Sequence, residues 1–146
     1  MQESWRTAIA RKTPSLPLRK ILSLYEFPKT AVILDFGCGK GRDLQYLLLE
    51  LGYDAYGYDP YFQPIKPSNA FDIVLCTYVL NSREKEAEAG IIEEIKSFCR
   101  PKGEIYITVR SDLKSDTKTQ RFVECPEGFE IRIKTKTFLT YYKVIS

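Results

Sequence analysis

Three aspartates and three glycines lie close together in the first half of the sequence. Asp35 and Asp43 flank the loop Gly37-Cys38-Gly39-Lys40-Gly41, and Asp59 follows eighteen residues after the last glycine. Glycines at alternate positions let a backbone approach a ligand closely. Two carboxylates beside such a loop disfavour a phosphate and favour a ligand with cationic centres. S-adenosylmethionine, which carries an ammonium and a sulfonium, is a ligand of that kind.

The two common phosphate-binding loops do not match this stretch. A nucleoside triphosphate loop needs G-x-x-x-x-G-K-[ST], and here the pair Gly39-Lys40 is followed by a glycine instead of a hydroxyl residue. The dinucleotide fingerprint G-x-G-x-x-G requires glycine where this chain has Arg42, which argues against NAD without excluding it. Asp43 also has a simpler interpretation, because an acid in a first helical turn stabilises the helix without any ligand.

Asp59 is placed to bind a ribose. An acid at the end of the strand after a glycine loop accepts hydrogen bonds from the ribose hydroxyls of adenosine-type cofactors. An aspartate before Pro60 would by itself more often belong to a turn. Its combination with the D-x-G-x-G-x-G pattern favours the ribose role.

Alternating strands and helices are predicted around these residues. Ser15 can cap a helix that carries Leu18, Ile21, Leu22 and Tyr25 on one face. Strands are predicted over 31–36, 53–58, 71–80 and 103–110, helices over 44–51 and 82–99, and a closing antiparallel hairpin over 129–134 and 137–145. This order predicts an α/β fold: a doubly wound, mostly parallel, Rossmann-like sheet with helices on both faces. Ligands bind beyond the carboxyl ends of such strands.

Composition predicts one domain over residues 1–146, with an N-terminal arm and helix in 1–28. The four cysteines are widely spaced and histidine is absent, so we expect reduced thiols and no metal site. We find no apolar run suited to a signal peptide or a membrane span, and therefore expect a cytoplasmic protein without a membrane partner. Net charge is +3 with basic flanks, which leaves a nucleic-acid partner open.

Four segments, VILDFGCGKGRD, GYDAYGYDP, FDIVLCTYVLN and RPKGEIYITV, resemble class I S-adenosylmethionine-dependent methyltransferases in order and spacing over residues 31–110. The resemblance implies that Asp35 lies near the methionine ammonium and Asp59 near the ribose. The other cofactor-binding residues it suggests are Gly37, Cys38, Gly39, Gly41, Asp43, Pro60, Tyr61 and Tyr78. The segments RTAIARKTPSLPLRKIL, DPY and VLN are also similar to methyltransferase-like proteins associated with DNA phosphorothioation and to related phage and bacterial proteins.

The chain departs from the family pattern between the second and third predicted strands. Only eleven residues, 60–70, separate Asp59 from the central strand, where the family usually has a helix, another strand and an acid that reads the adenine amino group. We therefore expect a reduced version of the fold. Tyr61, Phe62 or backbone groups of that loop would have to form the adenine pocket.

Methyl transfer from a sulfonium is an in-line displacement that needs no metal and no covalent intermediate. With no histidine, the candidates to assist an amine or hydroxyl acceptor are Tyr78, Asn81, Asp112 and Asp116. Tyr78 could instead be a packing residue, and Asn81 a helix cap. Cys76 lies inside an apolar strand and is expected to be inert.

The acceptor is expected to be bound by Arg110, at the start of a polar segment, and by Arg11 and Lys12 of the N-terminal arm. Each of these segments could instead be a plain surface connection. The function predicted from the sequence is methyl transfer to a nitrogen or oxygen acceptor, with nucleic acid or nucleotide ahead of a small metabolite. The alternative is a non-catalytic S-adenosylmethionine sensor or a subunit of a modification complex.

Overall fold

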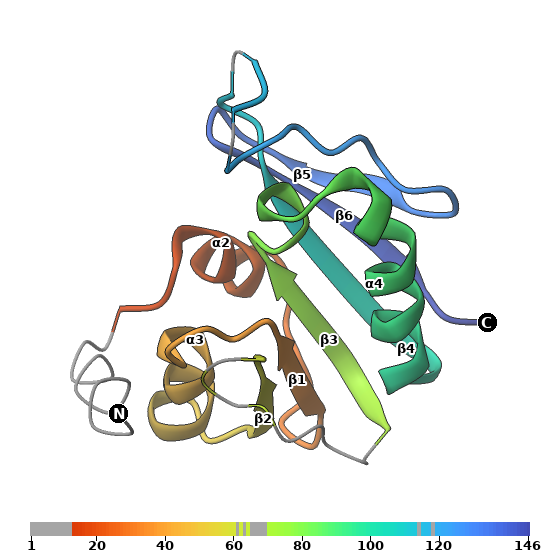
Figure 1. Ribbon diagram of the computed structural model, residues 1–146. Coiled ribbons are helices and arrows are strands. Elements are labelled where there is room, and N and C mark those ends of the chain that lie inside the picture. The colour runs from red at the N-terminus through yellow and green to blue at the C-terminus, as the bar shows by residue number, and fades with distance from the viewer. Residues whose placement is uncertain (1–12, 61, 63, 65–69, 114, 118) are drawn as a thin grey trace.

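The strands of the chain form one mixed sheet. The computed structural model describes residues 13–60, 62, 64, 70–113, 115–117 and 119–146. Within these residues six strands lie in the order β2-β1-β3-β4-β6-β5 (Figure 1). Their bounds are β1 (Val32–Phe36), β2 (Asp54–Tyr58), β3 (Phe71–Thr77), β4 (Cys99–Arg110), β5 (Glu130–Lys134) and β6 (Phe138–Val144). Strands β1 to β4 pair in parallel, whereas β6 runs antiparallel to both β4 and β5.

The helices cover both faces of this sheet. They are α2 (Leu16–Leu24), α3 (Arg42–Gln45), the π-helix η1 (Tyr46–Glu50), the 3₁₀-helix η2 (Leu80–Ser82) and α4 (Lys85–Phe98). Successive strand residues point to opposite faces. Ile33 of β1 therefore packs with α2 and α3, and Leu34 packs with α4 on the other face. The chain passes from β1 outward to β2 and then back across β1 to β3, so the predicted doubly wound fold is confirmed.

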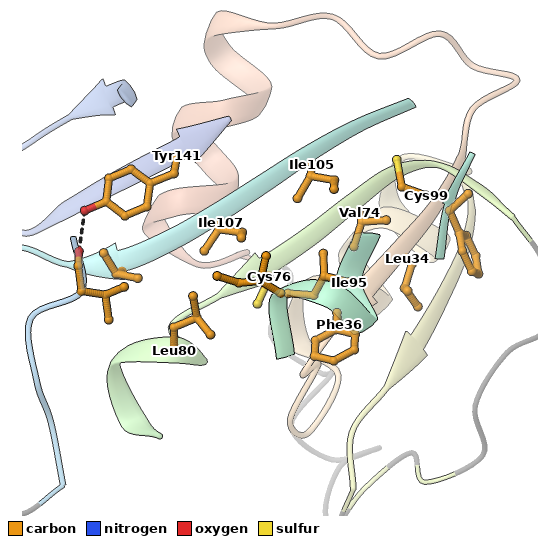
Figure 2. Packing of buried hydrophobic residues seen from close by; sticks show 14 of the residues in the cluster. Leu34, Phe36, Val74, Cys76, Leu80, Ile95, Cys99, Ile105, Ile107 and Tyr141 are labelled. Carbon is orange, nitrogen blue, oxygen red and sulfur yellow. Dashed lines mark hydrogen bonds between the residues drawn. The ribbon is translucent and has the colours of Figure 1, made fainter. Parts of the chain in front are cut away.

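A hydrophobic core lies between α4 and the central strands of the sheet. Figure 2 shows Ile95 of α4 among side chains of three strands, including Leu34, Val74 and Ile105, and all four are fully buried. Each side chain of this size contributes about 1.5–3 kcal/mol when it leaves water. At one end of the cluster the hydroxyl of Tyr141 donates to a backbone carbonyl (2.5 Å). The carboxyl ends of β1 and β3 thus rest on a well-packed layer.

Helix α2 begins where the sequence predicts. The Ser15 hydroxyl accepts a hydrogen bond from the Leu18 backbone N–H (3.3 Å), which is the capping interaction expected at a helix start. Pro17 lies in the first turn, where a missing N–H costs nothing. Leu18 and Ile21 are buried against the sheet, as the apolar spacing predicts.

The central strand is shorter than its apolar run indicates. Residues 71–80 were expected to form one strand, but β3 ends at Thr77 because Tyr78 adopts a left-handed conformation with φ of 61°. The chain then enters η2, in which Leu80 is fully buried. Apolar character continues past the strand because η2 packs into the core, and periodicity alone does not separate these two environments. Helix α4 accordingly begins at Lys85 and not at residue 82.

β2 is an edge strand within the described residues, because it pairs there only with β1. This agrees with the short connection of residues 60–70, which leaves little room for another helix and strand. The four cysteines are free thiols. In the described part of the chain, no group of three or more side chains could hold a metal ion, and no helix is long and apolar enough to span a membrane.

Candidate functional site

The glycine loop closes over the carboxyl ends of β1 and β2. Its backbone N–H groups at Gly37 and Cys38 both donate to the Tyr58 carbonyl, at 2.6 and 3.0 Å. These bonds fasten the loop to the end of β2. Because β3 pairs with the other side of β1, the residue after it, Tyr78, also reaches this edge. The predicted cofactor residues Asp35, Asp59 and Tyr78 are thereby brought together.

Asp35 is a buried carboxylate that has no partner in the described part of the chain. Its exposed fraction is 4%, and no hydrogen-bond donor or cation among the described residues contacts its side chain. Burial raises the pKa of Asp35 well above the ordinary value, and the nearby charges of Asp43 and Asp59 raise it further. A positively charged ligand would offset all three effects. The site is therefore complementary to a cation.

Two small pockets adjoin each other at this edge. The Asp35 pocket, about 160 Å³, is lined by Ser15, Asp35, Gly37, Cys38, Arg42, Asp43, Thr77 and Tyr78. The Asp59 pocket, about 270 Å³, is lined by Phe36, Gly37, Tyr58, Asp59, Pro60, Thr77, Tyr78, Val79, Ser82 and Arg83. Gly37, Thr77 and Tyr78 line both pockets. An elongated ligand could place a charged group near Asp35 and a second moiety near Asp59, with its middle beside these shared residues.

Gly37 is required for two separate reasons. Its φ of 76° is a conformation that side chains rarely allow, and a Cβ at this position would overlap the Val79 Cγ2 methyl. Gly39 and Gly41 also have positive φ values, of 56° and 90°. The three glycines predicted to support the cofactor thus form a left-handed loop that side chains would distort.

Asp59 orders the loops around its own pocket. One carboxylate oxygen accepts from the Gly39 N–H (2.9 Å), and the other accepts from the Phe62 N–H (3.1 Å). The same aspartate therefore links the glycine loop of β1 to the turn after β2.

Asp43 joins the glycine loop to the start of α2, a contact that the sequence analysis missed. Its carboxylate accepts from the Ser15 N–H (2.7 Å) and from the Ser15 hydroxyl (2.6 Å). The neighbouring Arg42 donates to the carbonyls of Thr13 and Pro14, at 2.8 and 3.3 Å. The segment before α2 is therefore held beside the Asp35 pocket. Ser15 was recognisable as a helix cap, but its distant partner left no local signal.

Tyr78 lies between the cofactor edge and the ion pair that follows β4. Its backbone N–H donates to the Thr108 carbonyl (2.8 Å). Burial, followed by the charge of Asp112, raises the pKa of the Tyr78 phenol; Arg110 lowers it and Asp43 raises it. The hydroxyl therefore stays protonated at neutral pH and can donate a hydrogen bond.

The Cys38 thiol of the glycine loop is also protonated. Burial raises the pKa of this thiol, so it is unreactive.

Arg110 and Asp112 are bound to each other. The Arg110 guanidinium contacts both Asp112 oxygens, at 2.9 and 3.0 Å. This hydrogen bond lowers the pKa of Asp112, so its carboxylate is ionised and a weak base. The predicted substrate residue Arg110 is thus paired with Asp112, and its charge lowers the pKa of Tyr78.

Asn81 lines a third pocket, which shares Ser82 and Arg83 with the Asp59 pocket. It is 2% exposed, its Nδ2 donates to Gln120 Oε1 (2.6 Å), and its Oδ1 has no partner among the described residues. It lines the Asn81 pocket, about 230 Å³, with residues that include Asp116 and Thr117. The helix-cap interpretation of Asn81 is wrong, because α4 has Glu84 at its cap position. Three further predicted residues, Arg11, Lys12 and Tyr61, lie outside the described residues.

A family model described as a methyltransferase domain matches residues 5–136. The chain belongs to this family. The predicted resemblance to class I S-adenosylmethionine-dependent methyltransferases is thereby confirmed, and with it the class of enzyme and its methyl donor. A search of curated protein sequences finds no match.

Several solved structures share the fold at low sequence identity. The 1,6-didemethyltoxoflavin-N1-methyltransferase of Burkholderia thailandensis, solved with 1,6-didemethyltoxoflavin and S-adenosylhomocysteine, is 19% identical with a TM-score of 0.70, over 99% of this chain and 84% of that one. TehB from Haemophilus influenzae is 18% identical with a TM-score of 0.62, and the match covers 88% of this chain and 62% of TehB. The magnesium protoporphyrin IX methyltransferase of Synechocystis PCC 6803 was solved with S-adenosylmethionine. It is 17% identical with a TM-score of 0.57, and the match covers 99% of this chain and 79% of that one.

Proposed function

We propose that this chain binds S-adenosylmethionine across the Asp35 and Asp59 pockets and methylates a nitrogen or oxygen of a small heterocycle, free or as part of a nucleotide. The observation that carries the proposal is the buried Asp35 carboxylate, which has no cation beside it in the described part of the chain. An uncompensated buried charge destabilises a protein. A cationic ligand removes that cost.

The two pockets suit the two ends of the cofactor. Asp35 would pair with the methionine ammonium, and Asp43 would add negative charge nearby. Asp59 and Pro60 would contact the ribose in the other pocket. The loop from Gly37 to Gly41, with Cys38, would support the cofactor with backbone groups. Tyr61, which lies outside the described residues, is proposed from its place in the sequence to contact the adenine.

The transfer point would lie beside the residues that both pockets share. When bound, the cofactor supplies an electrophilic methyl group, which the lone pair of an acceptor takes in an in-line displacement. Tyr78 would orient the acceptor as a hydrogen-bond donor, because its raised pKa keeps the phenol protonated. Orientation of this kind can contribute roughly 7–11 kcal/mol. The proton lost by an amine acceptor would pass to water or to the ionised Asp112.

A small acceptor is supported by the charge of the described edge. Asp35, Asp43 and Asp59 concentrate negative charge at the two pockets, and Arg110 is paired with Asp112. A polyanionic duplex would be repelled there, whereas a neutral heterocycle would not. The solved relative with a bound heterocycle, a didemethyltoxoflavin methyltransferase, gives a precedent in the same fold. Arg110, Arg11 and Lys12 would then contact polar groups of the acceptor, and Asn81 would act from the pocket that adjoins the Asp59 pocket at Ser82 and Arg83.

Calorimetric titration with S-adenosylmethionine, S-adenosylhomocysteine and NADH tests the cofactor. We expect both sulfur compounds to bind and NADH not to bind. Binding of NADH alone would refute the proposal. Asp35→Asn, which keeps the shape and removes the charge, should lose affinity for both sulfur compounds.

Transfer of a labelled methyl group to separate pools of DNA, RNA, nucleotides and small nitrogen heterocycles tests the acceptor. We expect label in the nucleotide or heterocycle pools. Label confined to duplex DNA would contradict the small-acceptor proposal. Cofactor binding with no labelled product in any pool would instead favour a sensor or a subunit of a modification complex.

A further inference from the structure

The Asp59 pocket has an unpaired cation on its wall. Arg83 is exposed and lines this pocket as well as the neighbouring Asn81 pocket. Five other arginines of the described chain donate to a carboxylate or to a carbonyl: Arg42, Arg100, Arg110, Arg121 and Arg132. The Arg83 guanidinium makes no such contact among the described residues. Its position at a pocket and its lack of a partner together point to a ligand.

The backbone of Arg83 is held even though its side chain is not. Its N–H donates to the Leu80 carbonyl (3.2 Å), and its carbonyl accepts from Arg121 Nε (2.7 Å). Arg121 is itself fixed by an ion pair with Glu88 (2.8 Å) on α4, and both side chains are largely buried. The side chain of Arg83 therefore projects from an anchored point at the end of η2.

The two flanks of the Asp59 pocket come from different strands. Asp59 and Pro60 follow β2, and Ser82 and Arg83 follow β3 by way of η2, with the end of β1 between them. A base attached to a ribose on Asp59 would lie in this gap. Within the described residues β2 is an edge strand, and only eleven residues lie between Asp59 and β3, where the resemblance to the family implies a longer segment with an adenine-reading acid.

We propose that Arg83 covers the adenine ring of the cofactor and supplies the recognition that the shortened chain lacks. This inference rests on the proposed function, because it assumes that the nucleoside half of the cofactor occupies the Asp59 pocket. A guanidinium is planar and weakly hydrated, so it stacks on aromatic rings better than an ammonium does. Arg83 would thus bind the base by its face and not by its hydrogen-bonding edge.

Calorimetry with S-adenosylhomocysteine and with adenosine tests this role, using the wild-type chain, Arg83→Ala, Arg83→Lys and Arg19→Ala. Arg19 is the matched control: it is an exposed arginine with no partner in the described residues, and it lines none of the pockets at this edge. We expect Arg83→Ala to weaken both ligands roughly 3- to 30-fold. Arg83→Lys should retain only part of the affinity, and Arg19→Ala should retain all of it.

The outcomes separate this inference from the proposed function. If the wild-type chain binds neither S-adenosylhomocysteine nor S-adenosylmethionine, the proposed function fails. If it binds them and Arg83→Ala binds equally well, only the inference is overturned. Full affinity in Arg83→Lys would also overturn it, because charge without a planar stack would then suffice. Melting temperatures equal to the wild type, which an exposed side chain predicts, would show that each variant is folded.

Discussion

The burial of Asp35 affects stability and ligand binding in opposite directions. The pKa of this carboxyl is higher in the native chain than in the unfolded one, so the native state binds more protons between those two values. The free energy of unfolding therefore falls as pH rises through that range. Above it, the ionised carboxylate destabilises the ligand-free protein. The same charge is what a cationic cofactor requires.

Asp35→Asn should consequently raise the melting temperature of the ligand-free protein while it abolishes cofactor binding. A gain of about 1 kcal/mol is expected, since a neutral amide costs less to bury than a charge. Thermal unfolding at several pH values measures it, and the difference from wild type should shrink as pH falls below the native pKa of Asp35. A variant that is less stable than wild type at a pH above the native pKa of Asp35 would contradict this account.

The hydroxyl of Tyr78 gives a second prediction for a single residue. Tyr78→Phe should lower the turnover number of methyl transfer roughly tenfold, because it removes one hydrogen bond to the acceptor. It should change the affinity for S-adenosylhomocysteine much less, because the aromatic ring that lines both pockets is kept. Steady-state kinetics and calorimetry measure the two effects, with Tyr46→Phe in η1 as a control away from the pockets. An unchanged turnover number would make Tyr78 a packing residue.

At the scale of elements, α2 is coupled to the cofactor edge through Ser15. This residue caps α2 and also donates two hydrogen bonds to Asp43 in α3. The start of a helix and the wall of a pocket thus depend on the same side chain. A shift of α2 would therefore move Ser15 and Asp43, which line the Asp35 pocket.

Ser15→Ala should therefore lower the free energy of unfolding by roughly 1–2 kcal/mol, because it removes the helix cap and one of the two bonds to Asp43. Denaturant unfolding measures this change. Ser23→Ala is the control, since Ser23 is at the exposed end of the same helix and bonds only to a carbonyl one turn earlier. Equal effects of the two substitutions would show that the Asp43 contact contributes nothing.

Local patterns in the sequence predicted the elements and the residues that lie next to them. Asp35, the glycine loop and Asp59 were recognisable because each is defined by its position in a strand, loop and helix sequence. The bond from Ser15 to Asp43 and the contact of Arg121 with the Arg83 carbonyl join residues 28 and 38 positions apart. Such contacts follow from packing and leave no periodic signal.

The misjudged boundaries have a similar cause. The left-handed turn at Tyr78 is unusual for an aromatic residue, so nothing in the apolar run of 71–80 indicated that the strand stops at Thr77. The π-helical turns of η1 also share the leucine pattern of an ordinary helix. Asn81 was grouped with Tyr78 because the two are close in sequence, yet the turn at Tyr78 directs Asn81 to another pocket.

At the scale of the whole molecule, cofactor binding should stabilise the fold by mass action. At a concentration of one hundred times Kd, a ligand that binds only the native state contributes about 2.7 kcal/mol. For a chain of 146 residues this corresponds to a rise in melting temperature of roughly 5–10 °C. Thermal shift with S-adenosylhomocysteine measures it. NADH at the same concentration should cause no shift.

The order of the strands has a consequence for synthesis of the chain on the ribosome. β6, the last strand of the described residues, lies between β4 and β5, so neither of these has its partner on that side until residue 144 has been added. Thirty-four residues separate Arg110 from Val144, which corresponds to about 2–7 s of translation. During that interval the unpaired backbone N–H and C=O groups along the edge of β4 are open to pairing with other nascent chains. Slow translation across residues 111–144 should therefore promote aggregation more than a delay earlier in the chain.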